Sequence, residues 1–155
     1  MKKAIARIAL PVLALSLATA AAAAGLKPEE QIQIRQAGYK FMSWNMGKIK
    51  ANLDGDYNAK QVEGAANAIA GIANSGMGAL FGPGTDKAIG DVKTAVKPAL
   101  FTDGENVGKL AGEFVAAAVN LQKVAVGGDP AAVKQAFGDL GASCKACHDK
   151  YRMKD

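Results

Sequence analysis

The sequence predicts an all-α protein, an antiparallel up-down-up-down four-helix bundle that occupies residues 25–155 as one domain. Three observations predict this fold class. Four segments place apolar residues at steps of three and four, no segment shows the alternation typical of a strand, and most connections between the segments are short. The chain has 155 residues, 50% of them hydrophobic and 21% charged, which suits one compact domain and leaves little room for two.

Residues 1–24 are expected to form a cleaved signal peptide that precedes the bundle. A basic start is followed by an apolar run from Ile8 to Leu17 and by small residues that end directly before Gly25. An uncleaved membrane anchor is the alternative, but the strongly apolar run is short for a span of about 20 residues. Export to a bacterial periplasm is therefore predicted, with no membrane segment left after cleavage.

The net charge of the mature chain is small. Three of the 19 Lys and Arg residues lie in the leader, and all 14 Asp and Glu residues lie beyond it, so the charge falls from +5 to about +2. No basic patch with interleaved aromatic residues is visible. Nucleic acid is therefore not an expected partner.

The first helix is expected over residues 28–53. Pro28 suits a first helical position, and the two acidic residues after it suit the positive end of the helix dipole. A seam follows the helix in steps of three and four residues. It consists of Ile32, Arg35, Tyr39, Met42, Met46, Ile49 and Leu53.

The second helix is expected over residues 59–74, with Asn58 as its N-cap. The connection that follows, from Ser75 to Gly104, is rich in glycine and proline. A loop of this length is unusual in a small domain and predicts a functional or ligand-supported segment, with a short helix near Ala99.

The third and fourth helices are expected over residues 105–126 and 130–152. Gly127 and Gly128 end the third helix as a left-handed C-cap would. Asp129 and Pro130 provide an N-cap and a first-turn proline for the fourth. The apolar face of the fourth helix consists of Val133, Phe137, Leu140, Cys144, Cys147 and Tyr151.

Both cysteines and the only histidine lie together near the end of the fourth helix, as Cys144-Lys145-Ala146-Cys147-His148. C-x-x-C-H is the attachment signature of a c-type haem. Cysteines three residues apart on a helix face the same way, so each can form a thioether with one vinyl group of the same haem. His148 then follows as the axial iron ligand. The motif therefore predicts one haem c per chain.

Three other interpretations of the two cysteines are weaker. A disulfide between them is resisted by mid-helix geometry. A thioredoxin-like dithiol normally lies at a helix start after a strand, whereas this pair lies near a helix end. A zinc site needs a fourth ligand, and no further Cys or His remains in the chain.

The segment Gly141–Arg152 resembles the C-terminal part of the cytochromes c′, the class II cytochromes c. Further matches are Lys27-Pro28-Glu29, Arg35-Gln36, Phe81-Gly82-Pro83-Gly84-Thr85 and Lys97-Pro98, so the resemblance covers essentially all of the mature chain. It implies that the bundle encloses a five-coordinate high-spin haem, which binds NO or CO or exchanges single electrons with an unknown redox partner protein. It also implies a homodimer through the first two helices. Phe41 and Trp44 lie off the apolar seam or at its margin, and they either help to bury this interface or are ordinary surface residues.

The resemblance also implies roles for four further residues around the haem. Tyr39 would cover the iron on the distal side, and Gln36 would lie at the haem edge. Arg35, a charge on an apolar seam, would pair with a haem propionate or else extend to the surface. Arg152 would shield the side of His148 or remain a solvated residue near the chain end. Thr94 is the polar side chain near Lys97-Pro98, but the spacing there departs from the family and no role is assigned.

Two other functions stay open at this point. Met42 or Met46 could bind the iron as a sixth ligand, giving a low-spin electron-transfer cytochrome, although both also suit the core as gap-fillers. Peroxidase or NO reductase activity is the second alternative. No distal histidine or acid–base pair is evident on the first helix, so a gas-binding or electron-transfer protein is predicted in preference to an enzyme.

Overall fold

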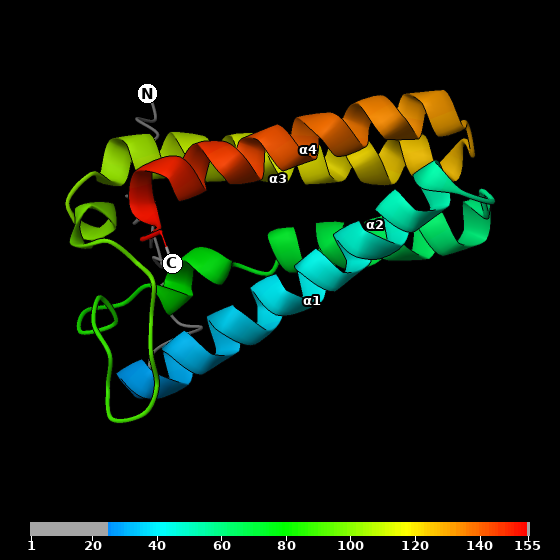
Figure 1. Cartoon of the computed structure of the whole chain (residues 1–155). Helices are drawn as coiled ribbons and strands as arrows, with labels where there is room; N and C mark the ends of the chain where they lie inside the picture. Colours follow the sequence, from blue (N-terminus) through cyan, green and yellow to red (C-terminus); the bar gives the residue numbers. More distant parts are fainter. Residues whose placement is uncertain (1–24, 155) are drawn as a thin grey trace, which may run out of the picture.

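The structure is a computed structural model that describes residues 25–154, so the predicted signal peptide lies outside the described residues. The chain forms α1 (Pro28–Asp54), α2 (Ala59–Ala73), η1 (Met77–Leu80), η2 (Pro98–Phe101), α3 (Gly104–Val126) and α4 (Pro130–Tyr151). Figure 1 shows the long helices side by side as a bundle. The four predicted helices and the short helix near Ala99 are confirmed, and each long helix ends within one residue of its predicted bounds. The 3₁₀ helix η1 was not predicted.

Local signals explain where the helices begin. The Asn58 side chain accepts a hydrogen bond from the Gln61 N–H (3.1 Å), and the Asp129 side chain accepts one from the Ala131 N–H (3.0 Å). Both side chains satisfy donors that a helix start would otherwise leave unpaired. The left-handed turn between α3 and α4 falls on Gly128, with φ of 70°, whereas Gly127 stays right-handed.

The hydrophobic core lies where all four helices converge. It contains the second half of α1, most of α2, and the facing parts of α3 and α4. Its fully buried members are Ile49, Val62, Ala65, Ala66, Ala118, Leu121 and Val133.

The bundle opens away from this core. Helices α1 and α2, α2 and α3, and α3 and α4 pack as neighbours, whereas α1 and α4 make few contacts. Figure 1 shows α1 and α4 diverging toward the end where α1 begins and α4 ends, with the segment between α2 and α3 at that end. The cysteines and the histidine therefore lie at the end where the helices are least tightly packed.

Candidate functional site

Helix α4 carries the three motif residues on its last two turns. Cys144 and Cys147 are free thiols and half-buried, and the side chain of His148 is exposed. Their spacing of three residues directs both sulfur atoms to the same side of the helix. The motif predicted from the sequence is thus presented as one face, with two sulfur atoms and an accessible imidazole.

Burial sets the protonation of these groups. Desolvation raises the pKa of both thiols, and for Cys144 the neighbouring Cys147 raises it further. Desolvation and then the positive charge of Arg152 lower the pKa of His148, and Asp149 opposes them. A neutral imidazole is the form that binds a metal ion. The site therefore favours the ligating form of His148 near neutral pH.

Tyr39 lies on α1 opposite the thiols. Desolvation raises the pKa of its hydroxyl, and Cys147 and Cys144 raise it further, while Arg35 lowers it. The side chain is 40% exposed, and its ring centroid lies 6.5 Å from that of Phe81. Tyr39 on α1 and Phe81 in the loop after η1 thus form an aromatic pair.

Arg35 is buried and is held by the loop between α2 and α3. Its Nη1 donates to the carbonyl of Leu80 (3.1 Å) and to Oγ1 of Thr85 (2.8 Å). Its Nη2 donates to the carbonyl of Thr85 (2.7 Å) and to Oγ1 of Thr94 (2.8 Å), and the guanidinium lies 4.5 Å from the centre of the Phe81 ring. All four Nη hydrogens are engaged, which leaves Nε–H for a further acceptor such as a propionate. Pairing with a propionate stays a prediction.

Two glutamines fasten the same loop to α1. The side-chain oxygen of Gln31 accepts a hydrogen bond from the Gly82 N–H (3.1 Å), and Gln36 donates to the carbonyl of Lys93 (2.7 Å). A Cβ atom at position 82 would lie 2.6 Å from the Gln31 oxygen, so a larger residue there would displace the Gln31 side chain from this hydrogen bond. The long connection is therefore an ordered wall of the open end.

Sequence reasoning missed the roles of Thr85 and Thr94. Thr85 is fully buried, and both threonines accept hydrogen bonds from Arg35 across more than 45 residues of sequence. A signal was present, because a buried guanidinium needs several acceptors and the long connection was the nearest unassigned polar segment. The pattern could not say which of its threonines would supply them.

The methionines of α1 belong to the core. Met42 is 6% exposed and is a member of the core cluster, and Met46 packs against it from the edge. Both are therefore placed as the gap-filling interpretation expects. Phe41 and Trp44 are instead exposed on another face of the same helix, with ring centroids 5.4 Å apart.

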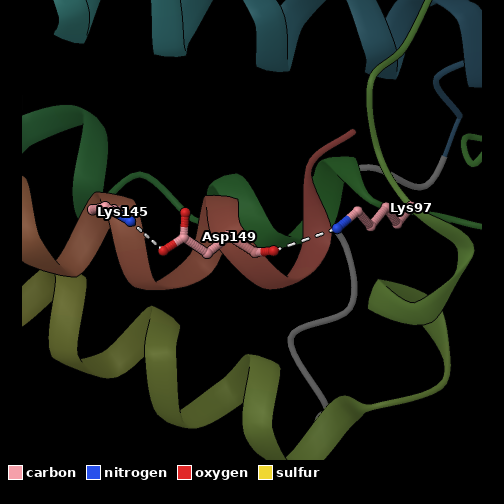
Figure 2. Close-up of polar contacts among 3 residues, drawn as sticks. All are labelled: Lys97, Lys145 and Asp149. Carbon is pink, nitrogen blue, oxygen red and sulfur yellow. Dashed lines mark hydrogen bonds and ion pairs between the residues drawn. The ribbon is translucent and has the colours of Figure 1, made fainter. Parts of the chain in front are cut away.

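The chain end beyond His148 is ordered by a second set of contacts. Lys145 pairs with the carboxylate of Asp149, and Lys97 Nζ donates to the carbonyl of the same residue (3.3 Å; Figure 2). An open hollow of about 440 Å³ lies beside this turn. It is lined by His148, Asp149, Arg152, Met153 and Lys154. Arg152 thus borders the same hollow as the histidine.

These residues fit a haem c. Two free thiols on one side of a helix match the two attachment points of the group, and the adjacent imidazole is exposed and favoured in its neutral form. Tyr39 on α1, whose hydroxyl pKa both cysteines raise, supplies an aromatic side chain for the same site. A four-helix bundle with this motif at the end of its last helix defines a class of c-type haem proteins.

The chain belongs to the cytochrome c′ family, whose family model matches residues 30–152. It is 66% identical over 154 residues to the cytochrome c′ of Allochromatium vinosum, across 99% of this chain and 100% of that one. A solved cytochrome c′ described as having a ligand-controlled dimer dissociation is 70% identical, with a TM-score of 0.83 over 84% of this chain and 99% of its own.

A more distant solved relative has been captured with gas ligands. A carbon-monoxide-bound variant of the cytochrome c′ from Alcaligenes xylosoxidans is 31% identical, with a TM-score of 0.73 over 83% of this chain and 98% of its own. The same relative has also been solved with bound NO. Haem c is the cofactor of this family, whose members are electron-transfer or gas-binding haem proteins.

Proposed function

We propose that this chain carries one haem c joined by thioethers to Cys144 and Cys147, with His148 as its axial ligand, and that it binds NO or CO or carries single electrons in a bacterial periplasm. The observation that carries the proposal is the half-buried face of α4, with both thiols and the imidazole on its last turns and Tyr39 opposite. The gas complexes of the Alcaligenes xylosoxidans relative support the ligand class.

Four residues would have distinct roles at this site. The two cysteines would hold the group to α4 by covalent bonds, and His148 would donate its neutral nitrogen to the metal. When bound, the haem supplies a redox-active iron that can take a small ligand. Tyr39 would cover the approach to that position, so that a ligand must displace its ring before binding, which favours ligands that bind strongly.

The positions of the methionines support a five-coordinate site. Met42 and Met46 pack into or against the core with Ile49. A methionine ligand would have to leave this packing, which costs burial and opens a cavity. Tyr39, whose hydroxyl pKa both thiols raise, would cover the iron with a phenol ring, which supplies no thioether ligand.

Two measurements on exported protein test the proposal. Mass spectrometry should show the chain cut before Gly25 with a tetrapyrrole on the peptide that contains Cys144 and Cys147. An optical spectrum should show high-spin bands in both oxidation states. Unmodified thiols would reject the haem assignment, and a low-spin spectrum with a methionine–iron charge-transfer band would favour the six-coordinate alternative.

We also propose a homodimer formed through α1 and α2. A second seam of residues spaced three and four apart follows α1 on the side away from the core, and most of its side chains are exposed. Its exposed members are Ile34, Ala37, Phe41, Trp44 and Ala51, and the partly buried Lys48 lies between the last two. The Lys48 ammonium lies 4.0 Å from the centre of the Trp44 ring. Such a stripe is typical of a helix that packs against another helix. The ligand-controlled dimer of the 70% identical relative supports this assembly.

A further inference from the structure

The last turn of α4, which carries His148, is fastened along its backbone. A helix end leaves four carbonyls without helical partners, and such ends usually fray. The four carbonyls of this end are those of residues 149–152. The Asp149 carbonyl accepts from Lys97 Nζ (3.3 Å; Figure 2), and the Tyr151 carbonyl accepts from the Lys97 N–H (2.8 Å). Lys97 therefore satisfies two of the four carbonyls.

The fastening continues beyond the helix. The Met153 N–H donates to the carbonyl of Ala95 (2.8 Å), and Val96 and Arg152 form an antiparallel bridge. Residues 95–97 and 151–153 thus pair like two short strands. The connection between α2 and α3 reaches across to hold the end of α4.

A side-chain network adds an anchor on α3. Tyr151 is 4% exposed, and its hydroxyl donates a hydrogen bond to the carboxylate of Asp103 and accepts one from Nδ2 of Asn106. Asn106 also donates to the same carboxylate (3.4 Å). Asp103 directly precedes α3, so the network joins the start of α3 to the end of α4. We call the paired segments and these three side chains the C-terminal clamp.

The side chain of His148 has little packing of its own. It is exposed, whereas Tyr151, three residues later on the same turn, is buried. The direction of the imidazole is therefore inherited from the backbone of this turn, and that backbone is held by the clamp.

We propose that Tyr151 and Asp103 are positioning residues for His148, which fix the turn that presents the imidazole. The inference rests on the proposed role of His148 as axial ligand. The sequence pattern predicts only that Tyr151 packs on the apolar face of α4, and the inference adds a positioning role to that packing. Charge strengthens the contact, because a hydrogen bond to a carboxylate is about twice as strong as one between neutral groups.

The test compares haem-loaded Tyr151→Phe and Asp103→Ala proteins with a matched control, Tyr57→Phe. Tyr57 lies beyond α1 at the other end of the bundle, and its hydroxyl is buried without a hydrogen-bond partner among residues 25–154. The control makes the same chemical change with no hydrogen bond to lose. Asp103 is exposed, and its side chain makes no capping hydrogen bond to α3. We therefore expect Asp103→Ala to fold, so the test still has a variant if Tyr151→Phe does not fold.

Two readouts separate positioning from general stability. Amide exchange at Arg152 and Met153 should accelerate about tenfold in both test variants, since a net contribution near 1.4 kcal/mol corresponds to a factor of ten. The iron–histidine stretching band of the ferrous protein should shift or broaden in the same two variants. Tyr57→Phe should leave both readouts unchanged.

The outcomes are distinguishable. Unchanged exchange would show that the network does not hold the turn. Faster exchange with an unchanged iron–histidine band would show that the clamp is structural and does not position His148. Protein exported without a tetrapyrrole, or a ferrous spectrum without any iron–histidine band, would instead overturn the proposed function, while the exchange data would still report on the clamp itself.

Discussion

Arg35 shows how a single charge can occupy a helix seam. Its position among apolar residues predicted that it would need partners, and the structure supplies them from the loop between α2 and α3. Burial lowers the pKa of the guanidinium, although Arg remains charged at any physiological pH. Arg35 also contacts the ring of Phe81, which lies beside Tyr39. Arg35 therefore both holds the loop and determines which aromatic side chain lies next to Tyr39.

Replacing Arg35 should therefore weaken the whole molecule. Arg35→Ala leaves two carbonyls and two threonine hydroxyls without their donor, and we expect a loss of about 3 kcal/mol in the free energy of unfolding. Arg35→Lys should recover less than half of it, because an ammonium cannot reach four acceptors in a fork. Urea denaturation measures both. Gln36→Ala, which removes one exposed hydrogen bond, is the control and should cost less than about 1 kcal/mol. Equal stability of Arg35→Ala and this control would contradict the role.

Tyr39 tests the idea of steric cover. If displacing the ring costs about 1.4 kcal/mol, Tyr39→Ala should speed CO association about tenfold. Tyr39→Phe keeps the ring and loses the hydroxyl, so its rate should stay near that of the parent protein. Stopped-flow mixing of the ferrous proteins with CO measures both rates. A Tyr39→Phe rate as high as that of Tyr39→Ala would assign the effect to the hydroxyl and remove the steric explanation.

At the scale of the elements, helices were more predictable than the segment between them. The ends of α2 and α4 follow from Asn58, Asp129 and Pro130, which act on neighbouring residues only. The long connection is held instead by partners far away in sequence, such as Arg35 for Thr85 and Tyr151 for Lys97. Periodicity carries no information on such pairs.

The same distinction applies to the site. The spacing of Cys144, Cys147 and His148 predicted one shared face because the helix itself fixes their directions. Tyr39 was placed by resemblance, and its 40% exposure depends on how far α1 diverges from α4, which no local pattern encodes. The sequence assigns no role to its partner Phe81, because the position of that ring depends on Arg35, which is 46 residues away in the chain.

The junction of α3 and α4 should show a defined pH dependence. The Tyr151 hydroxyl, with Asn106 and Lys150, holds the pKa of Asp103 below its ordinary value. A lowered carboxyl pKa adds stability above the unfolded value near 4, and this contribution is lost as pH falls through the folded value. Asp103→Asn should therefore melt lower than the parent protein at pH 7, and the gap should narrow between pH 4 and pH 2. Thermal unfolding followed by circular dichroism measures it, and a constant gap would contradict the assignment.

At alkaline pH the same hydrogen bond makes stability fall as the pH rises. Asp103 raises the pKa of Tyr151, so the contribution of the protonated hydroxyl is present below the unfolded value near 10 and is lost as pH rises through the folded one. The Tyr151→Phe protein lacks this group and should lose less stability between pH 9 and pH 11 than the parent. The two variants together assign the acid and alkaline changes to one hydrogen bond.

At the scale of the whole molecule, the candidate site adjoins the core. The core lies where all four helices converge, Cys144 packs against its edge, and the loop between α2 and α3 lies at the end where α1 and α4 diverge. Within the part of the chain that the structure describes, no helix is long and apolar enough to cross a membrane. Helix α1 carries both the core residues and Tyr39 along one seam, and the exposed aromatic residues Phe41 and Trp44 on its other side.

The exposed seam makes the assembly testable. Large apolar side chains at the centre of an interface often cost 2 kcal/mol or more when truncated, so Trp44→Ser should raise the dimer dissociation constant at least about 30-fold. Val126→Ser is the matched control, because Val126 is 66% exposed near the end of α3, away from the proposed interface. Sedimentation velocity over a concentration series should show monomers for the first variant and dimers for the second and the parent protein. A parent protein that is monomeric throughout the series, or a Trp44→Ser protein that dimerises as tightly as the parent, would exclude this face as the contact, because its central aromatic side chain would then bury no surface on association.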